Sequence, residues 1–147
     1  MKRLAAPLQG DRERGSEVIE AVIAVPAFLL FIGLIVFAGR VAIANQAVES
    51  AAAEAARTAS VARTAGDART TARTAAEATL ANQGLECLTS NVAVDTAGFA
   101  APVGTPAQVS ATVTCRVDAA DLALPGVPGS RTVTVTMSSP IDTYRGR

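Results

Sequence analysis

The sequence of 147 residues contains no histidine, no tryptophan and only two cysteines. Without histidine, neither a Ser–His–Asp triad nor a Cys–His pair can form. The usual zinc and haem ligand sets are missing for the same reason. Carboxylate-only catalysis stays open, but no pair of acidic residues stands out. We therefore predict a protein that is not an enzyme, with no catalytic residue, no metal and no other cofactor.

The chain has no excess of charge of either sign, and it has few aromatic residues. Thirteen basic residues balance thirteen acidic ones, so the chain has no basic surface of the kind that binds nucleic acid, and we predict no nucleic-acid partner. Three of the five aromatic residues, Phe28, Phe31 and Phe37, belong to a single apolar run. A large aromatic-rich core is therefore not expected in the remainder of the chain.

That apolar run follows a short polar leader, residues 1–15, which carries four basic side chains. Residues 21–39 are 19 uncharged residues, which as a helix would be about 28 Å long, close to the thickness of a bilayer core. We predict a transmembrane helix over residues 16–40 in the cytoplasmic membrane, in contact with membrane lipid. The basic leader favours a cytoplasmic N-terminus and an extracytoplasmic C-terminal domain.

Residues 41–83 are rich in alanine and contain no proline, which predicts that helix continues as an exported segment. The Gly66-Asp67 step predicts a break, with Asp67 capping a second helix. Residues 82–84 are typical of the end of that helix. Because the segment has no clean apolar stripe, we expect it to pack weakly, or to pack against other subunits through small alanine surfaces.

Residues 84–147 change to a composition richer in threonine, valine, proline and glycine, with alternation of period two. Residues 109–117 and 133–137 alternate most clearly, and residues 88–94 are a less regular third strand. We predict a small antiparallel sheet of about three strands. The fold class is therefore α+β: a long N-terminal helix, first transmembrane and then alanine-rich, followed by the sheet.

The β module is small enough that its core alone would be marginally stable. Cys87 and Cys115 lie near its first two strands, and a bridge between them would close a loop of about 28 residues, contributing about 3–4 kcal/mol. An extracytoplasmic location would allow the disulfide to form. The alternative is two free, buried thiols.

The most informative motif lies where the leader meets the apolar run. Gly15 ends the leader, Ser16 follows it, and Glu20 stands at the head of the hydrophobic helix. This arrangement resembles the class III leader of type IV prepilins and pseudopilins. The resemblance implies cleavage by prepilin peptidase between Gly15 and Ser16, which would make Glu20 the fifth residue of the mature chain.

Within that group, the same start together with Pro26 and Gly39 is similar to TadE-like minor pilins of the Tad (Flp) pilus machinery. The resemblance implies a pilin-like layout, helix assembly through Glu20 and Pro26, and a location in a cell-surface pilus or at its base. The implied partners are prepilin peptidase, the major Flp-type pilin, other minor pilins and the Tad assembly-platform membrane proteins. Ala21 stands where the major Flp pilin usually has tyrosine, which argues against the main shaft subunit.

Two alternatives remain open at this point. Ala42 and Ala44 form an A-x-A site after the apolar run, so signal peptidase could release a secreted protein beginning at Asn45. The chain could also be an uncleaved single-pass protein that holds a binding domain at the cell envelope. The N-terminus of the mature protein distinguishes the three hypotheses: processed pilin, secreted protein and uncleaved anchor.

Overall fold

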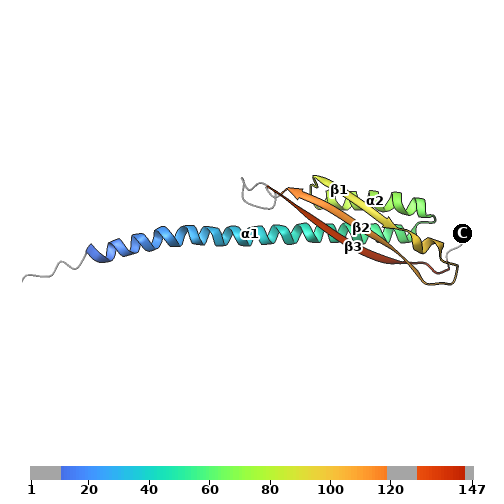
Figure 1. The fold of residues 1–147 in the computed structure, drawn as a ribbon, viewed down its shortest axis with the longest axis horizontal. Helices are drawn as coiled ribbons and strands as arrows, with labels where there is room; N and C mark the ends of the chain where they lie inside the picture. Colours follow the sequence, from blue (N-terminus) through green and yellow to red (C-terminus); the bar gives the residue numbers. More distant parts are fainter. Residues whose placement is uncertain (1–10, 119–128, 145–147) are drawn as a thin grey trace, which may run out of the picture. The chain divides into compact units, whose positions relative to one another are not determined.

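A computed structural model describes residues 11–118 and 129–144, with side chains described from residue 20 onward. A long helix is followed by a second helix, then by three strands with one short 3₁₀ helix among them (Figure 1). This order confirms the predicted α+β class. The elements are α1 (Asp11–Val61), α2 (Ala65–Asn82), β1 (Thr89–Asp95), η1 (Ala97–Ala100), β2 (Ala107–Asp118) and β3 (Ser130–Ile141).

The chain divides into two compact units, Met1–Val36 and Phe37–Arg147. The described part of the first unit is the N-terminal portion of α1. The second unit contains the C-terminal portion of α1 and every other element. Pro26 lies inside α1 in the first unit, and the helix continues on both sides of it.

The sheet has the order β1-β2-β3, and both strand pairs are antiparallel. The three strands predicted from alternation are all present, with somewhat different ends. The odd-numbered residues of β2 from Val109 to Val117 are buried, whereas Arg116 and Gln108 on the opposite face are exposed. The period-two pattern therefore identified the inner face of β2 correctly.

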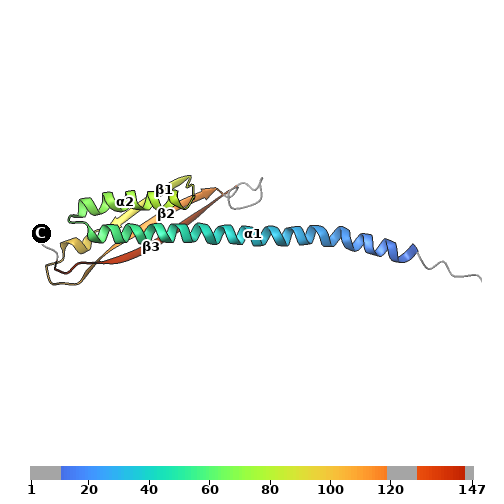
Figure 2. The same ribbon diagram turned by 180° about the vertical axis from the view of Figure 1, so that it is seen from behind.

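Both helices of the second unit cover that inner face, as the two opposite views show (Figures 1 and 2). One buried cluster joins alanines of α1 and α2 to the valines of the sheet. Ala51, Ala52, Ala55 and Ala59 are fully buried, so the expectation of weak packing is wrong. The small side chains let the helices lie close to the sheet, and the sheet supplies the apolar partner that the sequence of the helix did not reveal.

The turn between the two helices also differs from the prediction. α1 ends at Val61, and Thr64 rather than Asp67 is the N-cap of α2. The Thr64 hydroxyl accepts a hydrogen bond from the Asp67 N–H at 3.1 Å and donates one to the Asp67 carboxylate at 2.8 Å. Thr64 has the extended backbone that an N-cap requires, whereas Asp67 is already helical at the third position. The predicted end at residues 82–84 is confirmed: Gln83 is the C-cap, and Gly84 has a φ of 66°.

Two polar contacts connect the helices to the remainder of the unit. The Arg69 guanidinium donates to the buried Thr96 hydroxyl at 2.7 Å, which links α2 to η1. The Ser139 hydroxyl donates to that of Ser60 at 3.1 Å, which links β3 to the end of α1. The helix pair and the sheet are therefore joined by polar contacts as well as by the shared apolar core.

Gly98 in η1 provides a test of this packing. A Cβ built on Gly98 would collide with the backbone carbonyl oxygen of Gln108 and would lie 3.1 Å from the Ile141 Cδ1 atom. Gly98→Ala should therefore lower the free energy of unfolding by about 1–3 kcal/mol, because the backbone of β2 must move. Denaturant unfolding of the full-length chain in detergent, followed by circular dichroism, measures the change.

The matched control is Gly66→Ala, in the first turn of α2. The nearest atom to a Cβ at Gly66 is the Thr64 hydroxyl oxygen at 3.8 Å, which is an ordinary contact. Alanine is also the better helix former, by up to about 1 kcal/mol, so this variant should be neutral or more stable. Equal destabilisation by both substitutions would contradict the close approach at Gly98.

Candidate functional site

Gly15 and Ser16 lie in the first turns of α1, which begins at Asp11. The first ten residues of the predicted leader lie outside the described residues. The backbone at the predicted cleavage site is therefore helical in the uncleaved chain. A peptidase that reads extended backbone would have to unwind this end of α1, and glycine lowers the cost because it is a poor helix former.

Glu20 is exposed and lies at the start of a long apolar surface on α1. The side chains that follow it are turned outward, with exposed fractions such as 66% for Val22 and 71% for Leu30. Within residues 20–61 the helix contains one stretch that is long and apolar enough to cross a membrane. Such continuous apolar exposure is unfavourable in water, so this part of the chain is suited to act as a single-pass anchor.

The charge at Glu20 is therefore placed at the start of an apolar helix. No described side chain donates to its carboxylate or forms an ion pair with it within the chain. A carboxylate becomes costly as it approaches the hydrocarbon region, and the cost falls if a cation lies beside it. Six residues further along, Pro26 cannot donate the helical hydrogen bond to the carbonyl of Val22. Among the side chains that the structure describes, Glu20 has no partner, and Pro26 leaves the Val22 carbonyl without its helical hydrogen bond.

The two cysteines are joined in the structure. Cys87, between α2 and β1, is bonded to Cys115 in the C-terminal half of β2, with the two Cα atoms 5.4 Å apart. Cys115 is fully buried in the core, and the Leu88 N–H donates to the Arg116 carbonyl at 2.7 Å beside it. The bridge therefore holds the segment between α2 and β1 against the central strand, and neither cysteine is free.

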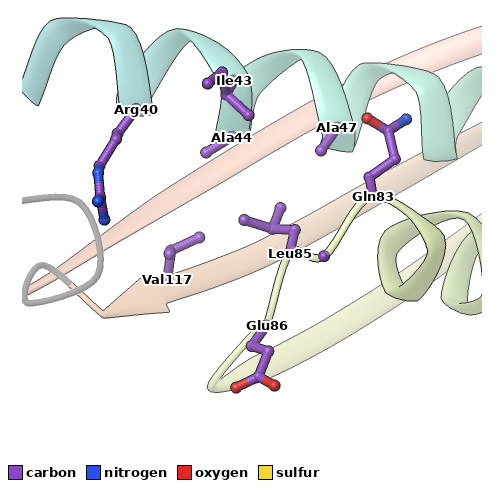
Figure 3. Close-up of a pocket in the computed structure, with 9 residues that line it drawn as sticks. Arg40, Ile43, Ala44, Ala47, Gln83, Leu85, Glu86 and Val117 are labelled. Carbon is purple, nitrogen blue, oxygen red and sulfur yellow. The ribbon is translucent and has the colours of Figure 1, made fainter. Parts of the chain in front are cut away.

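A shallow groove of about 450 Å³ lies in the second unit where α1 passes the end of β2 (Figure 3). Ala44 and Ala47 of α1 face Val117 and Leu85 across it, and Arg40 extends along its edge. The lining is mostly apolar. Among its lining residues, two are ionisable, Arg40 and Glu86. This groove could not be predicted from the sequence, because its walls come from three segments that only the fold brings together.

The sequence-predicted residues thus form two separate groups. Gly15, Ser16, Glu20 and Pro26 share the N-terminal part of α1, and Cys87 and Cys115 form a bridge in the second unit. Within the described residues, no three His, Cys, Asp or Glu side chains come close enough to hold a metal ion. The arrangement is suited to anchoring and helix-to-helix assembly.

Comparison with known proteins supports this description of α1. A family model described as TadE-like protein matches residues 15–57, which is less than a third of the chain. The matched segment begins at Gly15 and includes Ser16, Glu20 and Pro26, whereas α2 and the sheet lie outside it. The resemblance read from the sequence is confirmed over this segment. No curated protein and no solved structure matches the chain.

Proposed function

We propose that this chain is a structural minor pilin or pseudopilin, because residues 15–57 match the TadE-like family model and that family is associated with pili. It belongs in a Tad (Flp)-type pilus or secretion assembly, with the major Flp-type pilin, other minor pilins and assembly-platform membrane proteins as partners. The observation that supports this most directly is the family match that begins at Gly15 and contains Glu20 at the head of the apolar helix.

Processing by prepilin peptidase on the cytoplasmic side would remove residues 1–15. The cut would leave Ser16 as a new N-terminus with a free amine, which is a cation near neutral pH. The helix that remains would hold the protein in the cytoplasmic membrane, with the second unit outside. This topology also gives the disulfide the oxidising surroundings that it needs.

The new amine gives Glu20 a partner in a neighbouring subunit. Ser16 and Glu20 are four residues apart, about 6 Å along a helix axis. If the amine of one subunit pairs with the carboxylate of the next, parallel helices are offset by about this rise. The pair would neutralise both charges in a low-dielectric helix bundle and would fix the axial position of each subunit. A kink or local unwinding at Pro26 would help the helices to pack.

The burial of Ala44 weighs against release by signal peptidase. A cut before Asn45 would remove Ala44, which is 2% exposed, and Val41 from the packed core of the second unit. The mature domain would lose part of its own core. The uncleaved single-pass anchor differs from the pilin proposal chiefly in processing, so the mature N-terminus distinguishes the two.

Glu20→Ala should separate processing from assembly. The variant should still be inserted and cleaved to begin at Ser16, because the peptidase acts at Gly15. It should be strongly reduced in the pilus or pseudopilus fraction, because the Ser16 amine of the neighbouring subunit loses its carboxylate. Immunoblots of sheared and membrane fractions, with N-terminal sequencing, measure the two steps.

Glu17→Gln is the matched control. It also removes a negative charge close to the new N-terminus, but the motif does not require an acid there. Normal assembly of the control with poor assembly of Glu20→Ala is the expected pattern. Normal assembly of Glu20→Ala would contradict the pairing between subunits.

A further inference from the structure

Within residues 11–118 and 129–144, the two outer strands of the sheet each have one edge without a partner strand. Among the described residues, β1 and β3 pair only with β2. β3 is 12 residues long, whereas β1 has seven. The backbone N–H and C=O groups along such edges are available to pair with a further strand.

The central parts of both edge strands lack the usual features that prevent such pairing, which lie nearer the strand ends, at Asp95 in β1 and at Arg131 and Pro140 in β3. Natural proteins protect edges with charged residues, proline or very short strands. Residues 132–139 of β3 and residues 89–94 of β1 carry no charge and no proline. Val135 and Met137 are only half-buried although they belong to the inner face of β3, and Leu88 beside β1 is 57% exposed. Both edges thus offer apolar surface next to backbone groups that pair with no other described strand.

The directions of the strands favour one kind of partner. β1 and β3 both run antiparallel to β2, so they run parallel to each other. A second copy displaced sideways, and rotated only by the twist of the sheet, would bring its β1 beside β3 of the first, with the inner faces on the same side. Such a contact joins different surfaces of identical subunits and can repeat along an assembly, whereas pairing of β3 with β3 closes at two copies.

The register of the sheet makes this contact complementary. Val92, Val113 and Val135 form one row across the three strands, and Val94, Ala111 and Met137 form another. A displacement of the second copy along these rows would place Val92 of one copy beside Val135 of the next, and Val94 beside Met137. The copy reached in this way is a different neighbour from the one whose Ser16 amine pairs with Glu20, because that helix is offset by about 6 Å along its axis. On the outer face of the sheet, opposite the buried valines, Asn91 would lie beside Thr134. Apolar residues meet apolar residues and polar residues meet polar ones.

We propose that β3 of one copy pairs in parallel with β1 of a second copy of this chain, so that the sheet continues from subunit to subunit. This inference rests on the proposed function, because a pilus or pseudopilus requires a contact between two different surfaces that can repeat from subunit to subunit. It names the second unit as a contact surface in addition to the N-terminal helix.

Cysteine cross-linking of full-length chains in the native membrane tests the pairing. Asn91→Cys and Thr134→Cys are placed on separate copies and co-expressed. Neighbouring strands lie about 4.8 Å apart, and disulfides form at Cα separations of about 4.4–6.8 Å. Mild oxidation should produce covalent dimers that reductant reverses. Either variant alone should give no dimers. The negative control combines Asn91→Cys with Thr74→Cys, because Thr74 is exposed on α2, away from the sheet edges.

Charge at the edge provides a second readout. Asp95, Ser110 and Ser138 share a row, so Ser138 of one copy would lie beside Asp95 of the next. Ser138→Glu should lower the cross-link yield severalfold, and Ser138→Lys should preserve or raise it. Asp95→Asn retains an oxygen for the hydrogen bond from the Ala97 N–H, and it should restore the yield of the Ser138→Glu variant.

Each outcome decides between specific alternatives. Covalent dimers from Thr134→Cys alone would indicate pairing of β3 with β3, and a link to a different protein would indicate another occupant; both overturn the proposal. Absence of dimers in chains that begin at Ser16 would also overturn it while leaving the proposed function in place. Dimers in chains that still begin at Met1 would support the edge pairing and contradict the processing.

Discussion

Gly15→Val is expected to abolish processing, so that the full-length precursor accumulates in the membrane. Glycine has no Cβ, which allows extended backbone to enter a protease site without obstruction, whereas valine is bulky and stiff at χ1. Gly15 also lies within α1, which must unwind locally before cleavage. Intact mass and N-terminal sequencing of protein from the native membrane should show Ser16 as the first residue of the wild type and Met1 as that of the variant.

Gly10→Val is the control for this experiment, because it makes the same substitution within the leader, five residues upstream. It should be processed normally to Ser16. A wild-type protein that begins at Asn45 would identify a secreted protein and end the pilin proposal. A wild-type protein that retains Met1 in the presence of an active peptidase would identify an uncleaved anchor.

Removal of the disulfide should have the largest effect on stability. Cys87→Ser opens a loop with a sequence separation of 28 residues, which should lower the free energy of unfolding by about 3–4 kcal/mol. This is a large share of the roughly 5–15 kcal/mol that keeps typical domains folded. Cys115→Ser should be at least as harmful, because it also places a hydroxyl in the fully buried position of Cys115.

Reductant provides the control for the cross-link itself. It should lower the melting temperature of the wild type towards that of Cys87→Ser and should leave the variant unchanged. Without reductant, the intact wild type should weigh two hydrogens less than its reduced form. Identical melting of wild type and Cys87→Ser, with both thiols of the wild type reactive in protein from the native membrane, would contradict a stabilising bridge.

The C-terminal part of α1 belongs to the core of the second unit, which bears on where the chain can be cleaved. The part of α1 beyond Phe37 supplies buried alanines to the second unit, so the helix that is matched as TadE-like also completes the core of that unit. Cleavage after Gly15 would leave that part intact. Cleavage near Ala44 would not, which is the physical reason to favour processing at the N-terminal site.

Much of the architecture could be predicted from the sequence alone. The uncharged run of residues 21–39 predicts an anchor because its length matches a bilayer, and alternation in residues 109–117 predicts the inner face of β2 because strand side chains alternate. The end of α2 at residues 82–84 and the pair Cys87 and Cys115 were also visible. The helix and strand features depend on local pattern and length. The disulfide was visible because a chain with two cysteines allows one internal pairing.

The rest was decided by tertiary structure. In an alanine-rich helix every face looks similar, so the buried positions Ala51, Ala55 and Ala59 become identifiable only when the sheet is packed against them. The cap at Thr64 depends on where α1 stops and α2 folds back, and the groove beside Arg40 depends on three distant segments meeting. The rows that place Val92 level with Val135 exist only once the strand register is set, since one strand alone contains no information about its neighbours.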